Sequence, residues 1–144
     1  MRILLYIVIL ASLLFAPIKG LDVAHLEPVE VVWIYEDDGM IFLTTDTGAL
    51  GAGEDVLSAL CDLEARTSGV VYLDTAKYLL VEESAQGEVE ALRSRLNGTV
   101  RLCLAKAPDM EIAAKFLETH SDLPLLREWN MGEELPVWNG KIFS

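Results

Sequence analysis

Short β-branched runs alternate with amphipathic helical patterns along this chain, and that alternation restricts its fold more than any other feature. Residues 29–35 are rich in β-branched and aromatic residues, which predicts a strand, and residues 40–45 are predicted as the strand that returns from it. Gly39 lies between them and would supply the positive φ that a tight hairpin needs. Residues 54–67 follow as a predicted helix, because apolar side chains recur there at helical spacing.

The same alternation continues beyond this first helix. Residues 70–73 and 78–81 predict two more strands, and residues 84–96 predict a second helix. Residues 99–105 predict a strand inside the sheet, since both of its faces are apolar, and residues 108–120 predict a third helix. The order ββαββαβα predicts one small domain of the α/β class, with α+β as the alternative, in which helices pack on a mixed sheet.

The length of 144 residues suits one domain, which we expect to be flanked by segments of other kinds. Residues 1–20 are expected as a signal peptide or membrane anchor and residues 21–28 as a linker. The α/β domain would then span residues 29–122, and residues 123–144 would form a C-terminal tail. Within the domain, residues 47–53 contain three glycines and are expected as a loop.

The N-terminal segment has the order of an export signal. Arg2 precedes an apolar run at residues 3–18, and Lys19 and Gly20 follow it. The run is shorter than the ~20 residues of a comfortable membrane span, and no Ala-x-Ala cleavage site follows it. A cleaved signal and an uncleaved membrane anchor both fit, and either would export the rest of the chain.

The charge balance argues against nucleic acid as a partner. Asp and Glu number 23 against 11 Lys and Arg, which gives a net charge of −12. The first 20 residues contain Arg2 and Lys19 and no acid, so the remainder is more acidic still. Such a field repels phosphate backbones, and a solvated acidic surface is sufficient to explain it.

Two cysteines, Cys61 and Cys103, occur in the chain. Each lies in an apolar pattern, Cys61 on a predicted helix and Cys103 on a predicted strand. Two buried thiols are one interpretation, because cysteine is among the most buried residue types. A disulfide outside the cell is the alternative, and it requires the helix to lie over that strand.

No catalytic centre, cofactor site or metal site is predicted. The two histidines, His25 and His120, lack the spacing of metal ligands. The glycines before the first helix do not match a phosphate-binding loop, and acidic residues follow them. An enzymatic hypothesis remains only if carboxylates of Glu36, Asp74 and Glu82 meet at strand ends.

The predicted tail carries three large aromatic residues, Trp129, Trp138 and Phe143, in a segment without clear periodicity. These side chains could pack back onto the domain. They could instead form a contact strip for another protein, since aromatic residues are enriched at interface cores.

Part of the domain resembles a known family. The matching pieces are a helix end, two strands with a Glu pair, and a strand leading into a helix: residues 63–66 (Leu-Glu-Ala-Arg), 70–73 (Val-Val-Tyr-Leu), 79–83 (Leu-Leu-Val-Glu-Glu), and 100–107 continuing to Ile112-Ala113. From Asp55 to about Leu117 the chain resembles the N-terminal domain of the C subunit of spore germinant receptors, the Ger(x)C family. The resemblance implies a membrane-attached receptor subunit without catalysis. The family's lipidated cysteine has no counterpart here, so attachment would depend on residues 3–18.

Together these features predict a non-enzymatic interaction domain that works outside the cytoplasm in association with a membrane, as a receptor or spore germination component. A secreted domain that binds a small ligand or peptide is the first alternative. A small enzyme with carboxylates at strand ends is the second.

Overall fold

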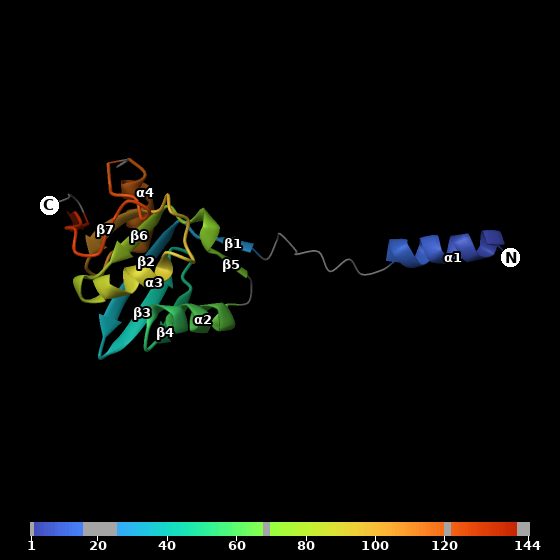
Figure 1. Cartoon of the computed structure of the whole chain (residues 1–144), viewed down its shortest axis with the longest axis horizontal. Coiled ribbons are helices and arrows are strands. Elements are labelled where there is room, and N and C mark those ends of the chain that lie inside the picture. Colours follow the sequence, from blue (N-terminus) through green and yellow to red (C-terminus); the bar gives the residue numbers. More distant parts are fainter. Residues whose placement is uncertain (1, 16–25, 68–69, 120–121, 141–144) are drawn as a thin grey trace.

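The computed structural model describes residues 2–15, 26–67, 70–119 and 122–140. They form an N-terminal helix and, apart from it in Figure 1, a domain of the predicted α/β class. A six-stranded mixed sheet organises this domain, in the order β4-β3-β2-β6-β7-β8. β2, β6, β7 and β8 run parallel, whereas β3 pairs antiparallel with both β2 and β4. The strands are β2 (Val31–Asp37), β3 (Met40–Thr45), β4 (Leu50–Gly53), β6 (Tyr78–Val81), β7 (Arg101–Ala105) and β8 (Val137–Trp138).

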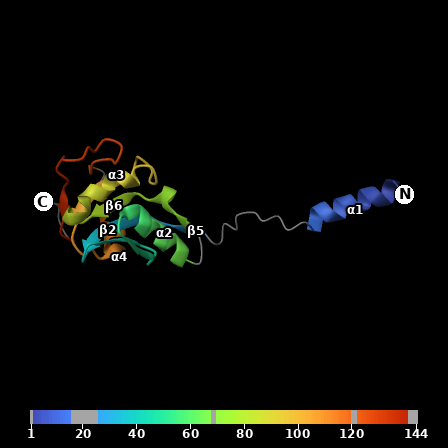
Figure 2. The same cartoon turned by 60° about the horizontal axis from the view of Figure 1, so that its bottom comes forward.

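Helices pack on both faces of the sheet. Residues of α2 (Val56–Arg66) and α3 (Val89–Leu92) belong to the larger apolar cluster on one face, and residues of α4 (Met110–Leu117) belong to a smaller cluster on the other. Figure 2 shows α3 and α4 on opposite sides of β2 and β6. The predicted helix at 84–96 is divided into the 3-10 segment η3 (Glu83–Glu88) and α3, because Gly87 weakens a continuous helix.

The β2–β3 hairpin forms as predicted, with Asp37 paired to Met40 across a two-residue turn. Asp38 and Gly39 have φ of 50° and 75°, the positive values that a type I′ turn requires at both positions.

The glycine-rich segment before α2 is a strand, so the prediction of a loop at residues 47–53 is wrong for β4. Gly51 and Gly53 face α2, and a Cβ on Gly53 would lie 2.5 Å from the backbone nitrogen of Ala59. A Cβ on Gly51 would likewise lie 2.5 Å from the backbone nitrogen of Leu63. These glycines therefore allow the helix backbone to approach the strand, which is a recognised use of glycine within a strand.

The buried stripe of α2 is narrow. Val56, Ala59, Leu60 and Leu63 are buried, whereas Leu57 and Cys61 remain exposed. Successive residues are turned by about 100° around a helix, so a close approach along one stripe leaves its neighbours outside. On α4, Ile112 is exposed for the same reason, while Ala113 and Leu117 are buried.

The C-terminal segment is part of the domain and not a tail over its described residues, 122–140. Its inward side chains Leu123, Leu126, Trp129, Leu135 and Trp138 are all buried. The segment also covers β7, which would otherwise be an edge strand with two apolar faces. The backbone N–H of Leu102 donates to Pro124 O (2.9 Å), and that of Leu104 donates to Pro136 O (2.8 Å). An unpaired edge is a template for association, so this pairing protects the domain.

Two arginines hold the C-terminal segment in place. The guanidinium of Arg93 donates to the carbonyl oxygens of Leu126 and, at 2.6 Å, Trp129. The guanidinium of Arg101 donates to the carbonyl oxygen of Leu123 at 2.7 Å. Hydrogen bonds from a charged donor are stronger than neutral ones, so the segment is fixed by polar contacts as well as by burial.

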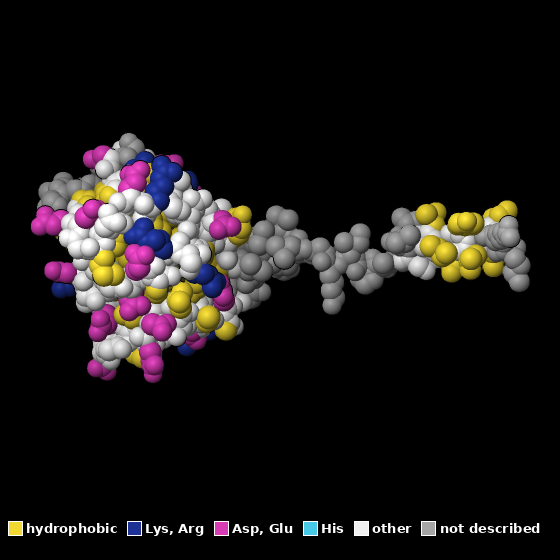
Figure 3. Space-filling view, viewed as in Figure 1, with side chains coloured by type: hydrophobic (Ala, Val, Ile, Leu, Met, Phe, Trp, Pro, Cys, Tyr) yellow, Lys and Arg dark blue, Asp and Glu magenta, His cyan; other side chains and the backbone are white. Residues whose placement is uncertain are grey.

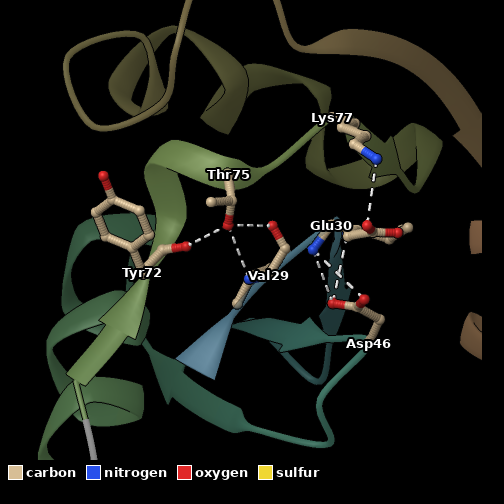
Figure 4. A network of polar contacts seen from close by, with 7 residues as sticks. Val29, Glu30, Asp46, Tyr72, Thr75 and Lys77 are labelled. Atoms are coloured by element: carbon tan, nitrogen blue, oxygen red, sulfur yellow. Dashed lines mark hydrogen bonds and ion pairs between the residues drawn. The ribbon is translucent and has the colours of Figure 1, made fainter. Parts of the chain in front are cut away.

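The chain enters the domain through a small polar network. The end of the expected linker forms β1 (Leu26–Pro28), which pairs in parallel with β5 (Val70–Tyr72). Figure 4 shows Thr75, from the 3-10 segment η2 (Leu73–Thr75), against Val29: its hydroxyl accepts from Val29 N–H (3.0 Å). The Asp46 carboxylate accepts from Glu30 N–H (3.1 Å), and Lys77 pairs with the Glu30 carboxylate (3.2 Å).

The N-terminal helix α1 (Arg2–Phe15) is apolar on all sides. Its side chains from Ile3 to Leu10 are 49–76% exposed, and Figure 3 shows apolar side chains along its visible surface. Among the described residues, no helix combines the length and apolar character that crossing a membrane requires.

Candidate functional site

One part of the sheet is left without a helix, and we call it the open face. Side chains alternate along each strand, and the pairing register places residues of β2, β3 and β4 side by side on the α4 side of the sheet. Met40 and Leu50 are 37% and 43% exposed there. The open face consists of Trp33, Tyr35, Met40, Phe42, Thr44, Leu50 and Ala52, with Asp37 at one end opposite Met40. Trp33 lies at its border and also packs against the apolar cluster under α4.

Three stacked aromatic rings form the centre of the open face. The ring centroids of Trp33 and Tyr35 are 4.1 Å apart, and those of Tyr35 and Phe42 are 5.1 Å apart, with planes inclined by 22° and 11°. The stacking fixes the orientation of each ring, so the row is preorganised for contact with a partner. The indole N–H of Trp33 is buried without a hydrogen-bond partner among the described residues.

Carboxylates lie at the end of the open face where the parallel strands terminate. Burial raises the pKa of the Tyr35 hydroxyl, and the nearby negative charges of Asp37 and Glu82 raise it further. Glu82 is oriented by its neighbours, since its carboxylate accepts from the backbone N–H of Glu36 (3.4 Å) and from the Ser84 hydroxyl (3.3 Å). This end of the open face is therefore electronegative.

An acidic groove lies at the other end of the same strands, beside α4. Its volume is about 390 Å³, and it is lined by Glu30, Asp46, Met110, Glu111, Ala114, Lys115 and Glu118. Glu30 and Asp46 stand at the start of β2 and the end of β3, where Figure 4 shows them in contact. The Lys115 ammonium lies 3.9 Å from the Glu111 carboxylate, so it offsets part of the negative charge.

A second cavity, of about 590 Å³, lies at the carboxyl ends of β6, β7 and β8. It is lined by Glu82, Glu83, Ser84, Leu104, Ala105, Lys106 and Val137. In open α/β sheets, ligands bind in crevices outside the carboxyl ends of the strands. This cavity has both signs of charge and an apolar wall, which suits a small polar molecule.

The aromatic residues expected as a partner contact have another role where the structure describes them. Trp129 and Trp138 are each 2% exposed, and they pack in the apolar clusters on the two faces of the sheet. Trp138 also stacks on Phe116 of α4, with ring centroids 5.4 Å apart. They therefore pack back onto the domain and present no contact strip, while Phe143 lies outside the described residues.

The disulfide between Cys61 and Cys103, considered as an alternative, is not formed, and both cysteines are free. The interpretation of two buried thiols is right for Cys103, in the cluster on the α4 side of the sheet, and wrong for Cys61, which is exposed on α2 on the opposite side. The sheet separates the two sulfurs, so the geometry that a disulfide needs cannot arise. Burial raises the pKa of the Cys103 thiol to about 12, so it stays protonated at neutral pH.

The three carboxylates of the enzymatic hypothesis do not meet. Only the backbone N–H of Glu36 contacts the Glu82 carboxylate, at the carboxyl ends of β2 and β6, and Asp74 precedes β6 in the 3-10 segment η2 and lies at its other end. Among the described residues, no group of three or more His, Cys, Asp or Glu side chains is placed to hold a metal ion.

The sequence interpretation used the aromatic content of β2 only to predict a strand and missed the open face. The signal was present in the i, i+2 spacing of Trp33 and Tyr35, which places both rings on one face of a strand. The hairpin register then brings Phe42 opposite Tyr35.

The chain matches no family model, no curated protein and no solved structure. The relation to the C subunit of germinant receptors therefore stays a prediction from sequence.

Proposed function

We propose that this chain is a non-enzymatic interaction domain that works outside the cytoplasm and is delivered there, or held at the membrane, by residues 3–18. The observation that carries the proposal is α1, whose apolar side chains from Ile3 to Leu10 are exposed on a helix outside the domain core. An apolar surface of this kind favours a lipid or translocation environment over water. The resemblance described above favours a subunit of a membrane receptor complex, as in spore germination.

Fractionation of cells of the native organism tests this location. We expect the full chain in the membrane fraction or the medium, and Ile7→Asp to shift it to the cytosol, because a charge within an apolar helix opposes membrane insertion. Ile7→Leu is the matched control and should behave as the parent chain. Full-length protein in the cytosol with Met1 retained would contradict the proposal.

The open face is the contact surface under this proposal, since stacked aromatic rings next to exposed Met40 suit a partner. A photo-crosslinking residue at position 40 should give a covalent adduct in native cells. The same residue at position 131, where Met131 is 59% exposed on the C-terminal segment, is the control. Equal adducts from both positions would argue against the open face.

The cavity at the carboxyl ends of β6, β7 and β8 favours a second candidate, a secreted domain that binds a small ligand. Release of the cleaved protein to the medium, with no adduct from position 40, would favour this candidate.

A further inference from the structure

Acidic side chains lie at both ends of the open face. Asp37 and Glu82 stand near Tyr35 at one end, and their charges act on its hydroxyl. At the other end the groove beside α4 has four carboxylates (Glu30, Asp46, Glu111, Glu118) against two lysines, Lys115 in its lining and Lys77 paired with Glu30 at 3.2 Å. The seven residues of the open face between these ends carry no charge. The surface is thus apolar in the middle and negative at its ends.

The neighbouring strand edge is not available to a partner at its centre. The outward backbone N–H of Ala52 on β4 donates to the Asp62 carboxylate at 2.9 Å. Asp62 is held in turn by Arg66, one helical turn later, at 2.9 Å. An added strand would have to displace this contact, so a partner should bind over the face and not along the edge.

We propose that the open face and the acidic groove bind a basic polypeptide segment that also carries apolar side chains. The apolar side chains would pack on Trp33, Tyr35 and Phe42, and lysine or arginine side chains would reach the carboxylates at the two ends. Charge complementarity selects this occupant, because the same carboxylates repel acidic polypeptides, nucleic acid and anionic lipid. The inference rests on the proposed role as an interaction domain and names the chemistry of its partner.

A peptide-binding assay on the full chain tests this inference. The protein is held in nanodiscs of zwitterionic lipid, empty discs serve as the blank, and the probe is a fluorescent 18-residue peptide of Leu and Lys. The same peptide with Glu in place of Lys should not bind. Raising the salt concentration should weaken binding of the Lys peptide, because the charges involved are exposed.

Two double substitutions, one the control for the other, and one single substitution locate the binding site. Glu111→Gln with Glu118→Gln removes two exposed charges from the groove and should weaken binding about fivefold. Glu128→Gln with Glu134→Gln removes the same charge from exposed positions of the C-terminal segment, at the edge of the sheet opposite β4, and should have a much smaller effect. Phe42→Ser should weaken binding about tenfold, as loss of a central aromatic contact does. If Phe42→Ser fails to fold, the Glu111→Gln/Glu118→Gln variant still tests the inference.

Equal loss of affinity in the two Glu pairs, or binding of the Glu peptide, would overturn the inference. These results do not depend on where the protein resides, so fractionation can fail while peptide binding succeeds. If the protein is found in the membrane fraction or the medium but does not bind the Lys peptide, the proposed location stands and only the inference of a basic partner is contradicted.

Discussion

The two ends of the described chain are both apolar, yet they have opposite relations to the domain. α1 exposes Ile3 to Leu10, whereas the C-terminal segment buries Trp129 and Trp138 to 2% exposure. The difference lies in polar partners, because the C-terminal segment shares backbone hydrogen bonds with β7 and receives others from Arg93 and Arg101. Apolar content alone therefore does not tell whether a terminal segment belongs to a core. Directional contacts with a defined edge decide it.

Among the changes that test this comparison, removal of residues 123–144 should have the largest effect on the stability of the domain. The truncated chain loses Leu123, Leu126, Trp129, Leu135 and Trp138 from the core. Each buried side chain of this size contributes ~1.5–3 kcal/mol, and a domain is stable by only ~5–15 kcal/mol. We expect no cooperative thermal transition by circular dichroism. A truncated chain that melts like the parent would show that the segment is an appendage after all.

Trp129→Ala should lower the free energy of unfolding by ~3–5 kcal/mol, because it leaves a cavity in the larger apolar cluster. Met131→Ala, two residues away at a position 59% exposed, should change it by less than ~0.5 kcal/mol. Urea titration measures both values. Similar effects of the two substitutions would contradict the burial of Trp129.

Arg93→Met keeps the length of the side chain but removes its donors to Leu126 and Trp129. Two carbonyl oxygens lose a charged partner, so we expect a loss of ~1–3 kcal/mol in the urea titration. Arg127→Met, at a side chain 60% exposed, is the control and should be near neutral. An equal loss for both arginines would mean that total charge matters and these hydrogen bonds do not.

Acid should loosen one turn of the C-terminal segment. The side-chain amide of Asn130, followed by its backbone N–H, holds the pKa of the Glu133 carboxyl below its usual value. A lowered folded-state pKa adds stability above the unfolded value of ~4.3, and this stability is lost as the pH falls through the folded-state pKa. Melting temperatures should therefore place Glu133→Gln below the parent at pH 7, with the gap closing in acid. Glu134→Gln is the control, and a gap that persists at low pH would exclude this origin.

Deletion of residues 2–15 should have the smallest effect. Because the side chains from Ile3 to Leu10 are exposed, their loss removes no part of the domain core, and the melting temperature should not change. A large drop would show that α1 packs on the domain and would remove the contrast between the two ends.

The α/β class, the β2–β3 hairpin and helices α2 and α4 could be predicted because local patterns specify them. The Asp38-Gly39 turn and the stripe on α2 at Val56, Leu60 and Leu63 follow from spacing alone. β4 could not be predicted, because Gly51 and Gly53 have low strand propensity and are required only by the approach of α2. The open face could be predicted only in part, since spacing aligns Trp33 with Tyr35 but does not reveal which face lacks a helix.

The sequence by itself determined the α/β class, the acidity and the separate apolar N-terminus, since each depends on composition or on residues close together in the chain. Only the tertiary structure decided the burial of the C-terminal segment, the separation of Cys61 from Cys103 and the stacking of the half-buried aromatic row. Those outcomes depend on contacts between residues far apart in sequence. Local propensities do not encode such contacts, because the free energy that fixes them comes from packing in the assembled domain.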